Sequence, residues 1–336
     1  MGDNKKHAFG NAEMIRTTVV IPNYNGISYI EACMESLFES NTPMQIIVVD
    51  NASSDGSKEL LLEKYADIAE VKLIFLAENT GFCHAVNMGI EAAETEFVFL
   101  LNNDTVIDRA CVRELENQIE KSQDIFSVSS KMINMRFPEK IDDAGDFYCA
   151  LGWAFARGKD KPATSYNQED RIFASCAGAS LYRRSIFEKI GMFDEAHFAY
   201  LEDVDIGYRA NIWGYRNMFA PKALVYHAGS GVSGSRHNKF KVDLSARNSI
   251  YLIYKNMPFI QILLNLPFLM PGYLIKLFFF ALKGMGGTYL KGIGKGILLS
   301  FSAQGRERKQ RFRMINLSNY LWIQWELWFG IVRRFF

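Results

Sequence analysis

Between Thr17 and Asp108 the chain alternates short β-branched runs with amphipathic stretches, in the order strand, helix, strand, helix, strand, helix, strand. The strand segments TTVVIP, QIIVVD, VKLIFL and EFVFLL are nearly continuous apolar runs, as expected for parallel strands covered by helices on both faces. The first helical segment repeats apolar residues at helical spacing, which predicts one buried face formed by Ile30, Cys33, Met34, Leu37 and Phe38. The pattern predicts an α/β fold with a mostly parallel sheet.

Polar residues gather where three of these strands end. The first strand runs into Pro22 to Asn25, the second into Asp50 to Asp55, and the fourth into Asn102 to Asp104. Each loop alone is consistent with an ordinary turn or a helix cap. Because ligands of such sheets bind beyond the carboxyl ends of the strands, three polar loops on one edge predict a ligand site.

Two common phosphate-binding motifs are missing from the sequence. A plain dinucleotide-binding fold needs GxGxxG after its first strand, and this chain has PNYNG there; no GxxxxGK[ST] motif occurs either. A bound phosphate would therefore need a metal ion to neutralise it, which directs attention to Asp104.

A cluster of carboxylates follows further along the chain. Glu202, Asp203 and Asp205 lie within four residues, beside several aromatic residues. Like charges and apolar surroundings raise carboxyl pKa values, which suits a general base. The alternative is a helix that begins with acidic residues in its first turn. Both interpretations can hold, with Asp203 as the base and Asp205 or Glu202 capping the helix or pairing with Arg209.

His227 ends the apolar run ALVYH and precedes the flexible segment AGSGVSGSR. A lone histidine at a strand end is often structural. A metal-binding histidine followed by a glycine-serine loop is the alternative, because such a loop can fold over a bound diphosphate.

Several motifs in fixed order resemble family 2 glycosyltransferases of GT-A fold, and in particular the bacterial rhamnosyltransferase branch. The resemblance covers roughly Thr17 to Asn256. The motifs are VVIPNYNG, VVDNASSDGS, ENTGFCHAVNMGI, FLLNNDTVI, CAGASLYRRS, GMFDE, YLEDVDIGYR and YHAGSGVSG.

The resemblance implies roles for individual residues. Asp203 matches the general base, and Asp104 with His227 would hold Mg or Mn, although Asn102 replaces the first acid of the family's DxD motif. Asp50 would read the pyrimidine base. The implied nucleotide-sugar site comprises Pro22, Tyr24, Asn25, Asp50, Asn51, Ser53, Asn79, Gly81, Asn103 and Asp104. Glu202 and Trp153 are candidates for contact with the acceptor, where Trp153 would stack on a sugar ring or simply pack. Arg247 and Asn248 match a weaker pattern without an assigned role.

The C-terminal part of the chain differs in net charge from the rest. Residues 256 to 336 hold 5 Lys, 6 Arg and 2 Glu, a local charge of +9, whereas residues 1 to 255 carry −8; the whole-chain charge of +1 gives no reason to expect nucleic acid. The charge-free run 257 to 275 is interrupted by Pro267 and Pro271, and we interpret it as interfacial helix; a KGMGGTYLKGIGKG linker and a Trp-rich basic end follow. Aromatic and basic residues together favour an anionic membrane surface over a helical hairpin packed on the catalytic domain.

These features define a domain prediction. We expect an N-terminal extension (1 to 16), a GT-A catalytic domain (17 to 256) and a C-terminal membrane-associating helical region (257 to 336). The catalytic domain divides into a nucleotide-binding half (17 to 108) and an acceptor half with a lid loop (109 to 256). No apolar segment of a secretory signal opens the sequence, and the five cysteines form no CxxC pair, so we expect reduced thiols at the cytoplasmic face of a membrane, with peripheral or monotopic attachment.

The expected activity is an inverting, metal-dependent, non-processive transfer of a sugar, with dTDP-rhamnose as the favoured donor and a polyprenyl-diphosphate-linked glycan as acceptor. The segment QRFRM resembles the QxxRW motif of processive members only by coincidence, since Met314 replaces its Trp. The alternatives are a UDP-sugar-dependent transferase with another acceptor, a nucleotidyltransferase, and a membrane-tethered sugar-binding protein without catalysis.

Overall fold

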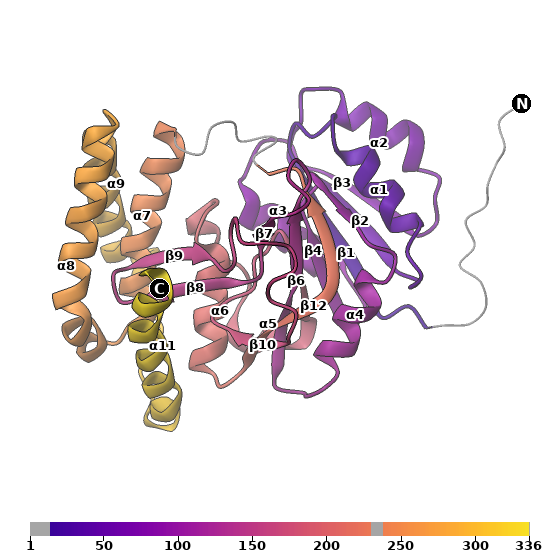
Figure 1. Cartoon of the computed structure of the whole chain (residues 1–336). Coiled ribbons are helices and arrows are strands. Elements are labelled where there is room, and N and C mark those ends of the chain that lie inside the picture. Colours follow the sequence, from indigo (N-terminus) through magenta and orange to yellow (C-terminus); the bar gives the residue numbers. More distant parts are fainter. Residues whose placement is uncertain (1–13, 230–237, 336) are drawn as a thin grey trace, which may run out of the picture.

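A computed structural model describes residues 14–229 and 238–335 of the protein (Figure 1). A central sheet has the strand order β10-β12-β6-β11-β4-β1-β2-β3, with β5 attached to β12 and β7 attached to β6; β8 and β9 form a separate hairpin. The strands are β1 (Thr17–Asn23), β2 (Gln45–Asp50), β3 (Val71–Phe75), β4 (Phe97–Leu101), β5 (Thr105–Ile107), β6 (Ile125–Asn134), β7 (Ile141–Asp143), β8 (Asp146–Cys149), β9 (Trp153–Ala156), β10 (Asp170–Ile172), β11 (Ala179–Arg183) and β12 (Arg216–His227). The α-helices are α1 (Ile30–Phe38), α2 (Ser57–Tyr65), α3 (Phe82–Ala92), α4 (Cys111–Ile119), α5 (Arg184–Ile190), α6 (Glu202–Ile212), α7 (Lys239–Asn256), α8 (Phe259–Leu282), α9 (Gly286–Phe301), α10 (Ala303–Glu307) and α11 (Leu317–Phe335).

The first half has the predicted order of strands and helices. β1, β2, β3 and β4 are parallel, and Asn23 at the end of β1 is paired with Asp50 at the end of β2. Alternate residues of β1 pack on opposite faces, because Val19 lies in the core cluster of α1 and Val20 in that of α3. The prediction of parallel strands covered by helices is confirmed for this half, whereas β11, β10, β5 and β7 pair antiparallel with their neighbours, so the central sheet as a whole is mixed.

Two strands of the second half bring distant residues to the rim of the first. β12 runs parallel to β6 and is paired with β5, with His227 opposite Thr105. Since Thr105 follows Asp104, this pairing places His227 next to the end of β4. The stretch from 135 to 170, which reads as loop in the sequence, contributes β7, β8 and β9.

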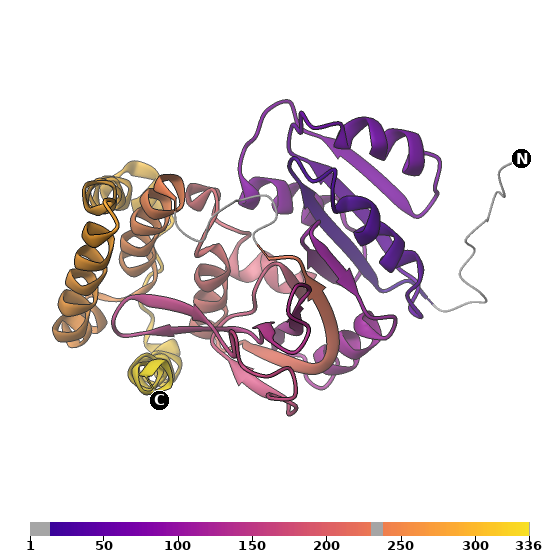
Figure 2. The same ribbon diagram turned by 45° about the horizontal axis from the view of Figure 1, so that its top comes forward.

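The β8–β9 hairpin extends from the sheet to the C-terminal helices, and both views place those helices on the side of the molecule opposite β3 (Figures 1 and 2). The backbone N–H of Ala150 in the hairpin turn donates to the carbonyl of Leu327 in α11 at 2.8 Å. The C-terminal region is therefore packed on an element that begins at the sheet.

α8 is one continuous helix that contains Pro267 and Pro271, so the expected interruption at these prolines is wrong. Each proline removes one backbone hydrogen bond, but a helix packed against neighbours tolerates this loss. Within the described residues, α8 is the one helix long and apolar enough to cross a membrane, with 24 residues and a mean hydropathy of 1.7.

Polar side chains of α8 are buried and most of its apolar side chains are exposed, which is the reverse of the arrangement in a helix on the surface of a soluble protein. Gln261 and Asn265 are buried: Gln261 accepts a hydrogen bond from Tyr208 at 2.7 Å, and Asn265 donates to Gln324 at 2.9 Å. The exposed surface of α8 carries Phe259, Ile260, Leu263, Leu264, Leu266, Phe268, Met270, Leu274, Ile275, Phe278, Phe279 and Leu282. We call these twelve residues the apolar face of α8.

The segment expected to be a linker after α8 is the helix α9. Gly292 and Gly296 lie on its side facing α7, where a Cβ atom would come within 2.5 Å of the carbonyl of Asp243 and 2.4 Å of that of Arg247. The glycines that suggest flexibility in the sequence instead allow α7 and α9 to approach closely. The linker interpretation was wrong for this reason.

Candidate active site

Asn23 joins three strand ends at the carboxyl edge of the sheet. Its side-chain amide donates to Asp50 Oδ1 at 2.7 Å, and its carbonyl oxygen accepts from the side-chain amide of Asn103 at 2.7 Å. Asn23 was not among the predicted site residues, although its position at the end of β1 was a usable signal. Its role is to tie together the loops after β1, β2 and β4.

Asp50 is buried, and both of its carboxylate oxygens accept hydrogen bonds within the rim. Oδ2 accepts from the backbone N–H of Ser53 at 3.0 Å, and the Ser53 hydroxyl accepts from the backbone N–H of Asn25 at 2.9 Å. Pro22 and Tyr24 lie on the same loop as Asn25, and the Tyr24 ring is exposed. The loop is thus held by its own polar groups while Tyr24 remains free to contact a ligand.

Asn51, Asn79 and Gly81 form a third wall of the rim. The Asn51 amide donates to Asn79 Oδ1 and to the Gly81 carbonyl, both at 3.1 Å. Gly81 has a φ of +89°, and a Cβ atom at this position would lie 2.5 Å from the ring of Phe198. Only glycine fits here, so this wall is joined to the segment that precedes α6.

His227 lies between two carboxylates. Its Nε2 is 3.2 Å from Asp104 Oδ1 and its Nδ1 is 2.7 Å from Asp142 Oδ2, and Asp142 also pairs with Lys159. Burial lowers the pKa of His227, but the hydrogen bonds to Asp104 and Asp142 outweigh it and raise the pKa to about 9. Asp142, 85 residues from His227 in sequence, was not predicted.

The spacing of Asp104 and His227 fits a divalent cation. Two adjacent ligands of an octahedral ion with bonds of about 2.1 Å lie roughly 3 Å apart, close to the observed 3.2 Å. Histidines that bind metals usually donate their second ring N–H to a carboxylate, which is the position of Asp142 here. The residues present therefore fit Mg or Mn, and Asp142 would orient His227.

A second group of carboxyl groups surrounds Asp203 in the first turn of α6. Asp203 Oδ1 accepts from the backbone N–H of Val204 at 2.7 Å, and its side chain is hydrogen-bonded to Asp146. Burial of its carboxyl group raises the pKa of Asp203. The pKa of Glu202 is raised to about 8, because Glu202 is itself buried and lies near the charge of Asp203. Asp146 Oδ2 is buried and has no hydrogen-bond partner within the described residues. This group can hold and release protons near neutral pH.

β7 connects the two groups through consecutive residues. Asp142 contacts His227. A carboxylate oxygen of Asp143 lies within 4.8 Å of a carboxylate oxygen of Asp146 and of the thiol sulfur of Cys176. Burial raises the pKa of Asp143 well above its ordinary value, and the charges of Asp142 and Asp203 add to this effect. None of these acids was predicted, although three acids close together in IDDAGDF were a signal that could have pointed to this part of the site.

The segment before α6 is strained. Phe198, Tyr200 and Leu201 have φ values of 63°, 71° and 67°, a region that residues other than glycine rarely adopt. Asn248 of α7 is buried and donates its amide to the carbonyls of Ala199 and Tyr200, both at 2.8 Å. Arg247 donates to the carbonyls of Ala196 and His197 at 2.7 and 2.8 Å. The sequence pattern assigned no role to Arg247 and Asn248; in the structure they hold the segment that positions Asp203.

Asp205 belongs to the structural part of α6. It is fully buried, accepts from Arg209 at 3.0 Å and Lys255 at 2.8 Å, and these cations lower its pKa against the effect of burial. Lys255 also contacts Asp194 at 2.7 Å. The expected pairing of Asp205 with Arg209 is present, and the network ties α6 to α7.

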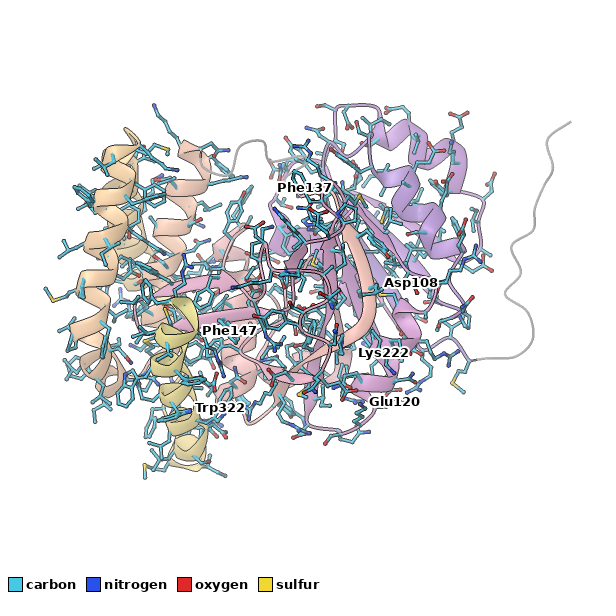
Figure 3. All side chains as sticks on the ribbon, in the orientation of Figure 1. Asp108, Glu120, Phe137, Phe147, Lys222 and Trp322 are labelled. Atoms are coloured by element: carbon cyan, nitrogen blue, oxygen red, sulfur yellow. The ribbon has the colours of Figure 1, made fainter. Side chains whose placement is uncertain are left out.

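Trp153 lies at the far end of the hairpin from Asp146. Its indole N–H donates to the carbonyl of Gly272 in α8 at 3.1 Å, and its ring contacts Phe335. Phe147 of β8 faces α11, and the guanidinium carbon of Arg333 in α11 lies 4.6 Å from the centroid of the Phe147 ring. Phe147 and Trp322 of α11 are labelled in Figure 3. The structure thus brings together the predicted residues at the rim but places Trp153 in the contact with the C-terminal helices.

Comparison with known protein families identifies the class of protein to which this site belongs. The family model described as glycosyl transferase family 2 matches residues 18–191. The chain therefore belongs to glycosyltransferase family 2 and is a glycosyltransferase of GT-A fold, which removes the nucleotidyltransferase and the non-catalytic binding protein from the alternatives.

Three proteins are similar to this chain, one in sequence and two in structure. The N-acetylglucosaminyl-diphospho-decaprenol L-rhamnosyltransferase of Mycobacterium tuberculosis is 24% identical over 235 residues, which are 62% of this chain and 75% of that protein. Staphylococcus aureus TarS 1–349 in complex with UDP-GlcNAc superposes with a TM-score of 0.59 and 17% identity, covering 93% of this chain and 89% of that one. GalNAc-T7 with UDP, GalNAc and Mn²⁺ superposes with a TM-score of 0.58 and 17% identity over 73% of this chain, which spans only 48% of GalNAc-T7.

Proposed function

We propose that this protein is an inverting, metal-dependent, non-processive glycosyltransferase that adds a sugar to a polyprenyl-diphosphate-linked glycan during cell-surface polysaccharide synthesis. The observation that carries the proposal is a run of acidic side chains between the two groups. Asp142 of β7 contacts His227 of the Asp104–His227 pair, and the next residue, Asp143, lies within 4.8 Å of Asp146 and is close enough to Asp203 for the Asp203 charge to raise its pKa. A base and a phosphate-neutralising group on one rim are what a single displacement at a nucleotide-sugar needs.

The donor would lie on the rim formed by Asn23 and its partners. Tyr24 would contact the base, Asp50 would support its recognition, and the residues Pro22, Asn25, Asn51, Ser53, Asn79, Gly81 and Asn103 would line the pocket. Asp104 and His227 would hold Mg or Mn, which supplies positive charge to the leaving diphosphate when bound. The first residues of the glycine-rich lid segment, Ala228 and Gly229, are described, whereas residues 230–237 lie outside the described part of the chain.

Asp203 would accept the proton of the acceptor hydroxyl as that hydroxyl oxygen attacks the anomeric carbon. The raised pKa values of Asp203 and its neighbours support this role, because a base is most effective when its pKa approaches the working pH. Glu202 would then contact the acceptor, and Trp153 would act only indirectly by holding the hairpin.

The apolar face of α8 and the positive charge of residues 256 to 336 support attachment to an anionic membrane at its cytoplasmic face. Peripheral or monotopic attachment would place Asp203 near an acceptor whose lipid stays in the bilayer. The mycobacterial relative is named as an L-rhamnosyltransferase with a diphospho-decaprenol acceptor, and this name, with the motif resemblance, supports rhamnose as the sugar and dTDP-rhamnose as the favoured donor. A UDP-sugar is the second candidate, because TarS was solved with UDP-GlcNAc.

The test is a panel of nucleotide-sugars given to the purified full chain, with donor hydrolysis and transfer to a lipid-linked acceptor measured separately. We expect one donor to be hydrolysed slowly without acceptor and transferred rapidly with it. Transfer of a UDP-sugar in place of dTDP-rhamnose would move the assignment to the second candidate, and transfer to soluble glycans alone would overturn the lipid acceptor.

A further inference from the structure

An apolar groove of about 420 Å³ lies between α7, α8 and α9. Its walls come from apolar residues and tyrosines of these three helices, among them Ile253, Leu274 and Leu290. Leu274 and Leu290 are 61% and 54% exposed, so the groove is open along one side. That side continues into the apolar face of α8, and a groove of this kind suits a branched hydrocarbon chain.

The groove is connected to the base by the β8–β9 hairpin. At the hairpin turn, Gly152 lies against Leu269 and Tyr273, which line the groove: a Cβ atom on Gly152 would be 3.2 Å from each. At the other end of the hairpin, Asp146 is hydrogen-bonded to Asp203. Cys149 and Asp146 are three residues apart on β8, about 10 Å at 3.3 Å per residue. One sugar and a diphosphate can bridge such a span.

A cation lies where the groove meets the hairpin. Lys276 is half-buried in α8, one turn beyond Tyr273, and its Nζ is 5.6 Å from the centroid of the Trp153 ring. It forms no ion pair with residues 14–229 or 238–335. A half-buried ammonium group without a carboxylate is stabilised by an anionic ligand.

We propose that the groove between α7, α8 and α9 binds the isoprenoid chain of the acceptor, and that Lys276 contacts the diphosphate that links this chain to the sugar. The inference rests on the proposed lipid-linked acceptor and assigns it a site. The hairpin then sets the distance between the lipid and Asp203.

The test uses the full chain in detergent micelles with two acceptors, N-acetylglucosaminyl-diphospho-decaprenol and the same diphosphosugar on a short isoprenoid chain. Leu290→Trp fills the groove but keeps the surface apolar. Its matched control is Leu298→Trp, since Leu298 is 75% exposed on α9 and does not line the groove. We expect Leu290→Trp to lower the ratio of kcat/KM for the long over the short acceptor about 10-fold, equivalent to about 1.4 kcal/mol, and Leu298→Trp to leave the ratio within about twofold of wild type.

Lys276 is tested with the short acceptor. Lys276→Met should raise the KM for this acceptor several-fold without changing the KM for the donor, and Lys276→Arg should restore it. If the wild-type chain uses both acceptors and Leu290→Trp leaves their ratio unchanged, the groove assignment is wrong while the proposed function stands. If the wild-type chain uses neither acceptor, the lipid-linked acceptor and this site are overturned together.

Discussion

The side-chain amide of Asn248 donates to the carbonyl of Tyr200 at 2.8 Å, and thereby fixes a left-handed residue three positions before Asp203. Replacing Asn248 with Ala leaves buried carbonyls without a donor, which costs about 1–3 kcal/mol. We expect kcat for transfer to fall about 10-fold or more, because Asp203 loses its fixed position, while the KM for the donor changes little.

The control for this variant is Asn211→Ala. Asn211 is also fully buried and donates to the carbonyl of Phe173 at 2.8 Å, but it lies near the end of α6 away from Asp203. Both variants should lose similar stability in thermal unfolding. A similar loss of kcat in both would show that Asn248 matters only for stability.

Asp203→Asn should lower the rate of transfer about 10³-fold, the middle of the range of about 10² to 10⁴ for a general base, while donor affinity stays close to wild type. Since a base acts only when ionised, the wild-type rate should rise with pH through the pKa of Asp203, which burial places above the ordinary aspartate value of 3.8. Initial rates from pH 4 to 9 and donor titration calorimetry measure both. Near-normal turnover of Asp203→Asn would remove it from the mechanism.

Activity should disappear in EDTA and return with Mg or Mn. Asp142→Asn should weaken Mn²⁺ binding about 10- to 100-fold, because His227 loses the carboxylate that orients it. Electron paramagnetic resonance of free Mn²⁺ reports binding independently of turnover. Asp160→Asn, an exposed change in the same region, is the control, and equal Mn²⁺ affinity in the two variants would contradict the site.

Glu202 gives a prediction for stability. Its pKa is about 8 in the folded protein against 4.5 for an ordinary glutamate, so the folded state binds more protons between these values. The stabilisation is complete below pH 4.5 and is lost as the pH rises towards 8. Denaturant unfolding at pH 5, 6.5 and 8 should show a smaller loss of stability in Glu202→Gln than in wild type; parallel curves would mean that Glu202 is ionised throughout.

The full chain should bind liposomes that contain anionic lipid and should dissociate in high salt. Each basic residue near such a surface contributes roughly 1 kcal/mol, and this contribution is screened by ions. Leu264→Gln with Ile275→Gln, on the apolar face of α8, should weaken binding further at low salt. Flotation assays measure the bound fraction, and a chain that stays in solution with anionic liposomes at low salt would contradict membrane attachment.

The sequence predicted the order of strands and helices in residues 17 to 108 well, because these elements follow local patterns. β1 is an apolar run, and α1 shows a helical repeat that the structure buries at Ile30, Cys33 and Leu37. Asp104 and Asp203 were singled out as candidates through short motifs.

Other parts depend on contacts between distant residues, which local patterns do not contain. Asp142 reaches His227 across 85 positions, and Asn248 reaches His197 across 51. Pro267 and Gly292 were misread for a related reason, since both residues usually interrupt helices and here lie inside helices that pack against neighbours.

The exposed apolar face of α8 has a practical consequence for the purification of this protein. In water without detergent, twelve large apolar side chains of α8 face the solvent, and burying them against a second copy is the readiest way to remove them from it. Under the proposed membrane attachment, a dimer or aggregate in a detergent-free preparation would therefore reflect the absence of lipid, and the stoichiometry should be measured in lipid or micelles.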